Sequence, residues 1–167
     1  LGDVYKRQNR WRVDGTVYEA RVAGQPVLVS LRSELGKIDL NRASPELLLS
    51  MAESVLDGSD PGEANRVADG ILDWRDADRN RRLHGAEDAA YAAAGRPYGA
   101  RDGAFVSVDE LTQVLGISEA LYARLRPLVT VHSGRAQVDP GTASVEVLRA
   151  LPGVTDLQAE AYLNAVS

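Results

Sequence analysis

The stretch GKIDLNRASPE, residues 36–46, divides the chain into a β-prone part and a helical part. Before it, over residues 10–32, apolar residues alternate with polar ones, as half-buried strands require. Within it, Ser44 can cap a helix that has proline at its first position, where a missing N–H costs nothing. After it, apolar residues recur at helical spacing, in Leu47, Leu48, Met51 and Val55. The sequence therefore predicts an α+β fold.

Residues 10–32 are expected to form two or three strands. Trp11 and Val13 precede the dipeptide Asp14-Gly15, and Val17 and Tyr18 follow it. Asp-Gly between β-prone runs is a strong hairpin signal, because both residues tolerate the positive φ angles of a tight turn. The first turn is therefore predicted at Asp14-Gly15.

Capping residues mark the further helices. Residues 60–63, DPGE, have a capping-box arrangement, and the helix after them carries one apolar face, formed by Ala64, Val67, Ala68, Ile71 and Trp74. At that spacing Trp74 is expected in the core. A helical turn is predicted over residues 87–93, and Ser107 and Ser118 are expected to cap two short helices.

The last part of the chain returns to a β-prone pattern and then to helix. Residues 128–132 and 136–139 flank the turn dipeptide Ser133-Gly134, which predicts a hairpin. Two more helices are predicted over residues 142–151 and 156–166, separated by Pro152-Gly153.

Composition excludes several classes of function. The chain has 167 residues, a formal charge of -5 and no cysteine, which excludes disulfides, thiolate catalysis and Cys-ligated zinc. With two histidines far apart, any metal would be held by oxygen ligands. No apolar run is long enough to span a bilayer, and because the first residue is Leu1, we expect the chain to be a fragment from which an anchor has been lost.

The most informative stretch is DGILDWRDAD, residues 69–78, followed by GAED at residues 85–88. Its aspartates fall at the end of a predicted helix, where the partial negative charge of the helix terminus repels them. Arginines 75, 79, 81 and 82 could compensate, giving an ion-paired surface. The functional alternative is a Ca²⁺ site, in which carboxylates and loop carbonyls supply six to eight oxygens. The predicted ligands are Asp76, Asp78, Glu87 and Asp88.

Residues 143–165 have the look of a helix-hairpin-helix, a module whose glycine-rich hairpin gives backbone N–H groups to phosphate. Here Gly153-Val154 is followed by Thr155, where such hairpins carry a second glycine. From residue 136 onward the segment has four acidic residues against one arginine, which opposes phosphate binding. A nucleic-acid-binding module is kept as the alternative function. A metal-dependent hydrolase is third, because every acidic pair is flanked by arginine that would keep both carboxylates ionised.

Taken together, the sequence resembles the general secretion pathway protein K family of type II secretion minor pseudopilins. The resemblance rests on Gly36 to Asn41, on Ala68-Asp69, on Ile71-Leu72 with the Asp-Trp-Arg-Asp-x-Asp motif of residues 73–78, on Gly85-Ala86-Glu87 with Tyr91, and on Pro97-Tyr98, Phe105-Val106-Ser107, Glu110-Leu111, Val114 and Gly116. It extends from about residue 10 to the end of the chain. The motif of residues 73–78 combined with Gly-Ala-Glu is specific to the family, whereas Ile-Asp-Leu-Asn is shared with DNA-uptake proteins.

The resemblance implies a pilin-like scaffold with a large, mainly helical, SAM-like domain inserted into its sheet. It divides the chain into an unassigned tail (1–9), a pilin-like β segment (10–37), the helical inserted domain (38–127) and a returning hairpin with helices (128–167). It also implies an N-terminal membrane helix and C-terminal sheet strands that this fragment lacks.

The functional implications are those of a non-enzymatic structural protein. The resemblance implies a place at the tip of a periplasmic pseudopilus, other minor pseudopilins and secreted substrates as partners, and an anchor in the inner membrane. It implies no nucleic-acid partner. Family members bind calcium, which supports the acidic-loop interpretation.

Overall fold

The fold combines helices and strands, as predicted. A computed structural model describes residues 11–56, 58, 60 and 62–166. The chain forms two compact units, Leu1–Ser33 and Glu34–Ser167. The tail predicted for residues 1–9 lies outside the described residues.

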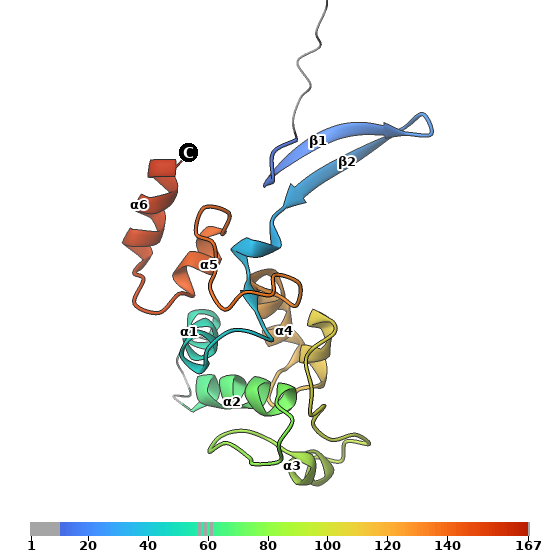
Figure 1. The fold of residues 1–167 in the computed structure, drawn as a ribbon, viewed down its shortest axis with the longest axis vertical. Helices are drawn as coiled ribbons and strands as arrows, with labels where there is room; N and C mark the ends of the chain where they lie inside the picture. Colours follow the sequence, from blue (N-terminus) through green and yellow to red (C-terminus); the bar gives the residue numbers. More distant parts are fainter. Residues whose placement is uncertain (1–10, 57, 59, 61, 167) are drawn as a thin grey trace, which may run out of the picture. The chain divides into compact units, whose positions relative to one another are not determined.

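The first unit contains a β-hairpin made of β1 (Asp14–Val22) and β2 (Gln25–Arg32), paired antiparallel (Figure 1). The strands were predicted correctly, but the turn was placed wrongly. The chain reverses at Ala23 and Gly24, whose φ angles of 49° and 82° match the turn that suits the twist of a hairpin. Gly15 instead adopts its φ of 89° where the strand register shifts, between Asp14 and Val17.

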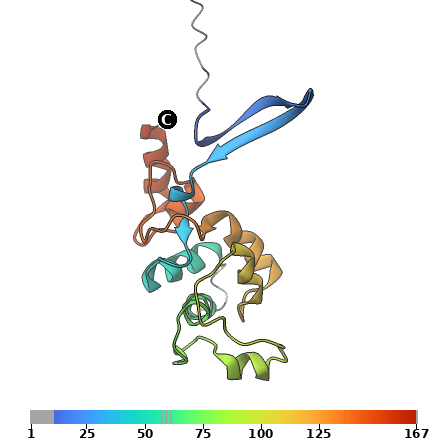
Figure 2. The same cartoon turned by 45° about the vertical axis from the view of Figure 1, so that its right-hand side comes forward.

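The second unit is mainly helical. Its elements, in chain order, are η1 (Glu34–Gly36), β3 (Ile38–Asp39), α1 (Pro45–Val55), α2 (Glu63–Arg75), α3 (Asp88–Ala93), η2 (Val108–Gln113), α4 (Glu119–Leu125), η3 (Arg126–Leu128), β4 (Val129–Thr130), α5 (Val145–Arg149) and α6 (Asp156–Val166). In Figures 1 and 2, α1 lies against α2, and α3 lies at the end of this unit opposite α5 and α6. Within the described residues, no helix has both the length and the apolar character needed to cross a membrane.

The helix starts follow the predicted capping residues, with one exception. Ser44 accepts a hydrogen bond from the Leu47 N–H, and Ser118 accepts one from the Leu121 N–H. The capping box predicted over residues 60–63 does not form, since α2 begins after Gly62, which makes no side-chain cap. The Asp60 carboxylate instead accepts from the Gly62 N–H and pairs with Arg66.

The hairpin predicted over residues 128–139 is wrong. β4 pairs in parallel with β3, Ile38 opposite Val129 and Asp39 opposite Thr130, and residues 136–139 form no strand. The reason is Asp39, a buried carboxylate at the end of β3. Its Oδ2 accepts hydrogen bonds from Gly134 N (2.7 Å) and Ser133 Oγ (3.1 Å), so the Ser133-Gly134 turn is fixed to β3.

The core of the second unit includes a cluster of aromatic rings around Trp74, near the end of α2. Trp74 is buried, as predicted, with Tyr91, Tyr98 and Phe105 at centroid distances of 5.8, 6.4 and 6.3 Å. These rings join the end of α2, helix α3 and the loop that precedes η2. The acidic residues singled out in the sequence lie on these same elements.

Candidate metal centre

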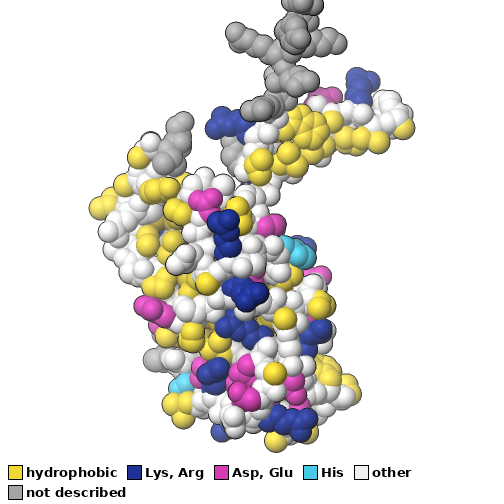
Figure 3. Space-filling model, in the orientation of Figure 1, with side chains coloured by type: hydrophobic (Ala, Val, Ile, Leu, Met, Phe, Trp, Pro, Cys, Tyr) yellow, Lys and Arg dark blue, Asp and Glu magenta, His cyan; other side chains and the backbone are white. Residues whose placement is uncertain are grey.

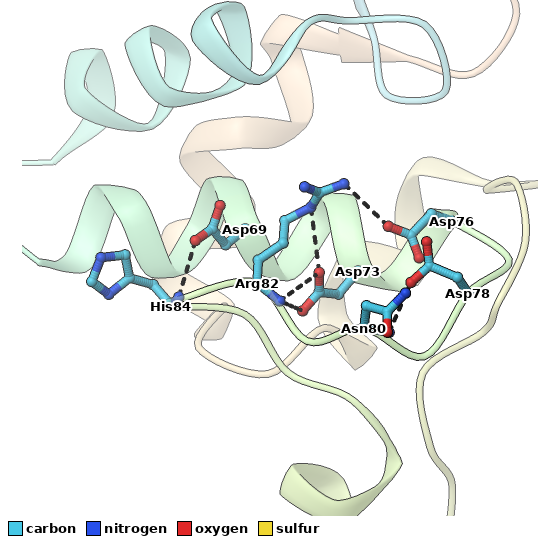
Figure 4. A network of polar contacts seen from close by, with 7 residues as sticks. All are labelled: Asp69, Asp73, Asp76, Asp78, Asn80, Arg82 and His84. Carbon is cyan, nitrogen blue, oxygen red and sulfur yellow. Dashed lines mark hydrogen bonds and ion pairs between the residues drawn. The ribbon is translucent and has the colours of Figure 1, made fainter.

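The loop that follows α2 is fixed to that helix by two carboxylates one turn apart, Asp69 and Asp73, which we call the anchoring pair (Figure 4). Asp69 Oδ2 accepts a hydrogen bond from His84 N at 3.0 Å. Both oxygens of Asp73 accept from Arg82 N, at 3.3 and 3.2 Å. The loop therefore has partners in the protein itself.

Asp73 is the more deeply placed member of the anchoring pair, with 0% of its surface exposed. Burial raises the pKa of its carboxyl group, while the hydrogen bond from Arg82 N and the charge of Arg82 oppose that rise. Its Oδ2 lies so close to Gly85 that an added Cβ there would be only 2.0 Å away. Gly85 is therefore needed because no side chain fits between the loop and this carboxylate.

The first two predicted ligands, Asp76 and Asp78, lie in this loop. Asp76 is half-buried, and its Oδ2 pairs with Arg82 Nη2 at 3.2 Å, while its Oδ1 is buried without a hydrogen-bond partner. Asp78 is exposed and accepts a hydrogen bond from Asn80 N at 2.7 Å. Asp76 thus has a free buried oxygen, and Asp78 stabilises a turn at the surface.

Glu87, the third predicted ligand, is a buried acidic residue. It is only 7% exposed, and neither of its carboxylate oxygens has a hydrogen-bond partner. Burial, followed by the negative charges of Asp73, Asp102, Asp76 and Asp88, raises the pKa of Glu87 to about 7. A buried carboxylate without donors is costly, so its surroundings favour either a bound proton or a bound cation.

Two more aspartates complete these surroundings. Asp88, the fourth predicted ligand, is exposed, and its Oδ1 lies so near Gly99 that an added Cβ would be 1.8 Å away. Asp102, which the sequence analysis missed, has a buried Oδ1 without a partner and a φ of 53°, rare for a residue other than glycine. Its other oxygen is 3.9 Å from Arg79 Nε. We refer to Asp76, Glu87 and Asp102 as the open carboxylates.

The open carboxylates fit a hard cation by chemistry. Four buried carboxylate oxygens lack donors, one on Asp76, two on Glu87 and one on Asp102, and calcium takes six to eight oxygen ligands. Among the residues that the structure describes, no three acidic or histidine side chains are grouped closely enough to hold a metal ion. The unpartnered buried oxygens are the observation that supports the site.

The sequence analysis named four ligands, of which Asp76 and Glu87 carry buried oxygens without hydrogen-bond partners. It also named Asp88, whose negative charge helps to raise the pKa of Glu87, and Asp78, which is exposed. It missed Asp102 because a single aspartate in a Gly- and Arg-rich loop carries no pattern. The only signal in the sequence is the Asp102-Gly103 dipeptide, which is typical of a turn and does not by itself indicate a ligand.

Acidic and basic side chains alternate on the surface around this region. Figure 3 shows them side by side over the part of the helical unit where Figure 1 places α2 and α3. The ion-paired surface that the sequence offered as the alternative is therefore present, with Arg82 between Asp73 and Asp76. It pairs one oxygen each of Asp73, Asp76 and Asp102 with an arginine, and it leaves both oxygens of Glu87 and the second oxygens of Asp76 and Asp102 without partners.

Comparison with known proteins shows the family. A model described as "Type II secretion system (T2SS), protein K" matches residues 39–134, more than half of the chain and the whole of this region. The chain belongs to the type II secretion protein K family. The residues matched include every predicted ligand and all the open carboxylates.

Protein K relatives align with the chain over a limited part of their own length. The type II secretion system protein K of Pseudomonas aeruginosa is 36% identical over 118 residues, which are 70% of this chain and 33% of that protein. The protein K of Dickeya chrysanthemi is 34% identical over 110 residues, 66% of this chain and 28% of that protein. The chain therefore spans about a third of the length of each of these two protein K relatives.

A solved structure shares the fold of this protein K chain. It is a chain of the crystal structure of the GspK–GspI–GspJ complex of the type II secretion system from enterotoxigenic Escherichia coli. The TM-score is 0.69 at 21% identity, with 86% of this chain and 53% of that chain covered. At this level of identity the likeness shows the fold.

Proposed function

We propose that this chain is part of a structural minor pseudopilin that sits at the tip of the type II secretion pseudopilus and takes part in protein export across the outer membrane. The observation that carries the proposal is the family match over residues 39–134. The fold shared with a chain of the GspK–GspI–GspJ complex supports partners of the same kind, which are the cognate minor pseudopilins I and J. No catalytic role is proposed.

The proposal includes an arrangement of the parts. Residues 10–37 are the pilin-like β segment, residues 38–127 the SAM-like inserted domain, and residues 128–167 return to the pilin-like part. Hydrophobic side chains along one side of the β-hairpin support a role for it in a larger sheet (Figure 3). The full-length protein would be anchored in the inner membrane, with these parts on its periplasmic face and secreted substrate as a further contact.

The proposal also assigns calcium to the acidic region. Asp76, Asp78, Glu87 and Asp88 are the ligands expected from the sequence, and the free buried oxygen of Asp102 adds a fifth candidate. Calcium would neutralise carboxylates that otherwise repel one another. Its role would be to fix the segments that carry α3 and Asp102 to the end of α2.

The nucleic-acid alternative is not favoured. Gly153, with a φ of 75°, does form a tight turn between α5 and α6. The family match points to a secretion component, and the acidic character of residues 136–167 weakens any attraction to phosphate.

The assembly test uses the tagged chain and the cognate minor pseudopilins I and J, co-expressed and separated by size-exclusion chromatography. The proposal predicts that the three proteins elute together in a buffer with calcium. A labelled DNA duplex titrated into the chain is the control, and no complex is expected at physiological salt. Failure to co-elute, together with micromolar DNA binding that falls steeply with salt, would overturn the structural role.

A further inference from the structure

Glu110 lies outside the open carboxylates and yet holds the segment that carries one of them. It is 7% exposed and sits on η2, whose first turn is capped by Ser107. Both carboxylate oxygens of Glu110 have hydrogen-bond partners, whereas those of Glu87 have none. Its Oε1 accepts from Val106 N at 3.0 Å, and its Oε2 accepts from Trp74 Nε1 at 3.3 Å.

An ion pair adds a third contact, because Arg101 Nη1 lies 3.3 Å from Glu110 Oε2. Arg101 and Val106 flank the segment 102–105, so one carboxylate holds this segment at both ends. Trp74 comes from α2, between Asp73 and Arg75. Glu110 therefore connects the segment to the helix end at which Asp76 lies.

Asn41 provides a second clamp on the same segment. Its Oδ1 accepts from Phe105 N at 2.7 Å, and its Nδ2 donates to Phe105 O at 2.9 Å. Neither clamp involves Asp102 itself, whose backbone is held at a φ of 53°. A backbone conformation of that kind persists only where its surroundings enforce it.

From these contacts we infer that Glu110 is a positioning residue, which holds the segment 101–106 and thereby fixes the place of the Asp102 carboxylate, whose buried, unpartnered oxygen can then bind a cation. This inference rests on the calcium site proposed above. The physical reason is preorganisation. Because the segment that carries Asp102 is already held by hydrogen bonds, it loses less conformational entropy when the carboxylate binds the cation. Glu110 needs no contact with the cation to have this effect.

The test measures the calcium dissociation constant of the folded full chain by calorimetry, for the parent and for Glu110→Gln. Glutamine keeps the shape of the side chain and loses the charge that pairs with Arg101. Changes in such supporting groups weaken metal affinity by about 10- to 100-fold, and we expect a loss in that range. Asp109→Asn is the matched control, because it removes one charge from the same helix at an exposed position and should leave affinity unchanged.

A double variant separates positioning from general stability. If Glu110 acts through Asp102, adding Glu110→Gln to Asp102→Asn should weaken calcium binding no further than Asp102→Asn alone. A purely structural role would lower the melting temperature of the calcium-free chain and leave the dissociation constant unchanged. If Glu110→Gln does not fold, Arg101→Gln removes the other half of the ion pair at a more exposed position and should show the same loss.

The outcomes distinguish this inference from the proposal beneath it. No calcium binding by the parent chain would overturn both. Calcium binding by the parent with an unchanged constant in Glu110→Gln, or with additive effects in the double variant, would overturn the positioning role and leave the calcium site standing.

Discussion

The anchoring pair and the open carboxylates lie in the same region and belong to the same residue types, and they differ in their partners. Asp69 and Asp73 accept hydrogen bonds from backbone N–H groups of the loop, whereas Glu87 accepts none and Asp76 and Asp102 each keep one buried oxygen free. The first set holds the loop without a cation. The second set has oxygens left without partners, to which we assign the cation proposed above. Acidic residues near a helix end can therefore serve as structural contacts or as candidate ligands, and their donors decide which.

The largest effect is expected at Asp73. Asp73→Ala leaves the Arg82 N–H without its acceptor and opens space beside Gly85, so the free energy of unfolding should fall by about 3 kcal/mol. Asp73→Asn keeps an acceptor and removes a charge that is costly to bury, so its loss should be much smaller. Urea unfolding in the presence of a chelator measures both. Equal losses for the two variants would show that the charge, and not the hydrogen bonds, holds the loop.

The next effect concerns pH and separates Glu87 from the anchoring pair. Because the folded pKa of Glu87, about 7, lies above its ordinary value of 4.5, its contribution to stability is fully present below about pH 4.5 and is lost as pH rises through 7. Without calcium, Glu87→Gln should therefore be more stable than the parent at pH 8, by roughly 1 to 3 kcal/mol, and similar to it at pH 5.

Melting temperatures in chelator across that pH range measure this difference. Calcium requires the ionised carboxylate, so its addition should help the parent more at pH 8 than at pH 5. If the melting temperatures of the parent and of Glu87→Gln differed by the same amount at every pH, the assignment of Glu87 as a buried carboxylate without partners would be contradicted.

The smallest effect is expected at Asp78, the predicted ligand that is exposed. Asp78→Asn should change calcium affinity less than Asp76→Asn, because Asp76 has a free buried oxygen and Asp78 already accepts from Asn80 N. Calorimetric titration of calcium into the two variants gives the ranking. The reverse ranking would show that the loop refolds around the cation and that its calcium-free arrangement does not define the ligands.

The sequence was sufficient where a signal is local. Ser44 and Ser118 marked helix starts because each cap acts within three residues, and the spacing of apolar residues placed Trp74 in the core. It failed where distant segments compete. The Ser133-Gly134 turn could have closed a hairpin, but the Asp39 carboxylate, far away in the sequence, binds it.

The same limit applies to the candidate site. Asp76 and Glu87 stood out because they lie in clusters of acidic residues, whereas Asp102 is isolated in the sequence. Glu110 and Asn41 contact its neighbours Arg101, Val106 and Phe105, which hold the segment in which Asp102 lies. No spacing rule contains such contacts, because they join segments separated by long stretches of chain.

The most direct test of the calcium site is the thermal melting of the full chain in chelator, in saturating calcium and in magnesium at the same concentration. Calcium at 100 times its dissociation constant should raise the melting temperature of the parent by about 5 to 10 °C. Magnesium should do much less, because it demands a strict octahedron of ligands. Glu87→Gln should lose most of the calcium response. A parent melting curve that does not change in saturating calcium would contradict the account.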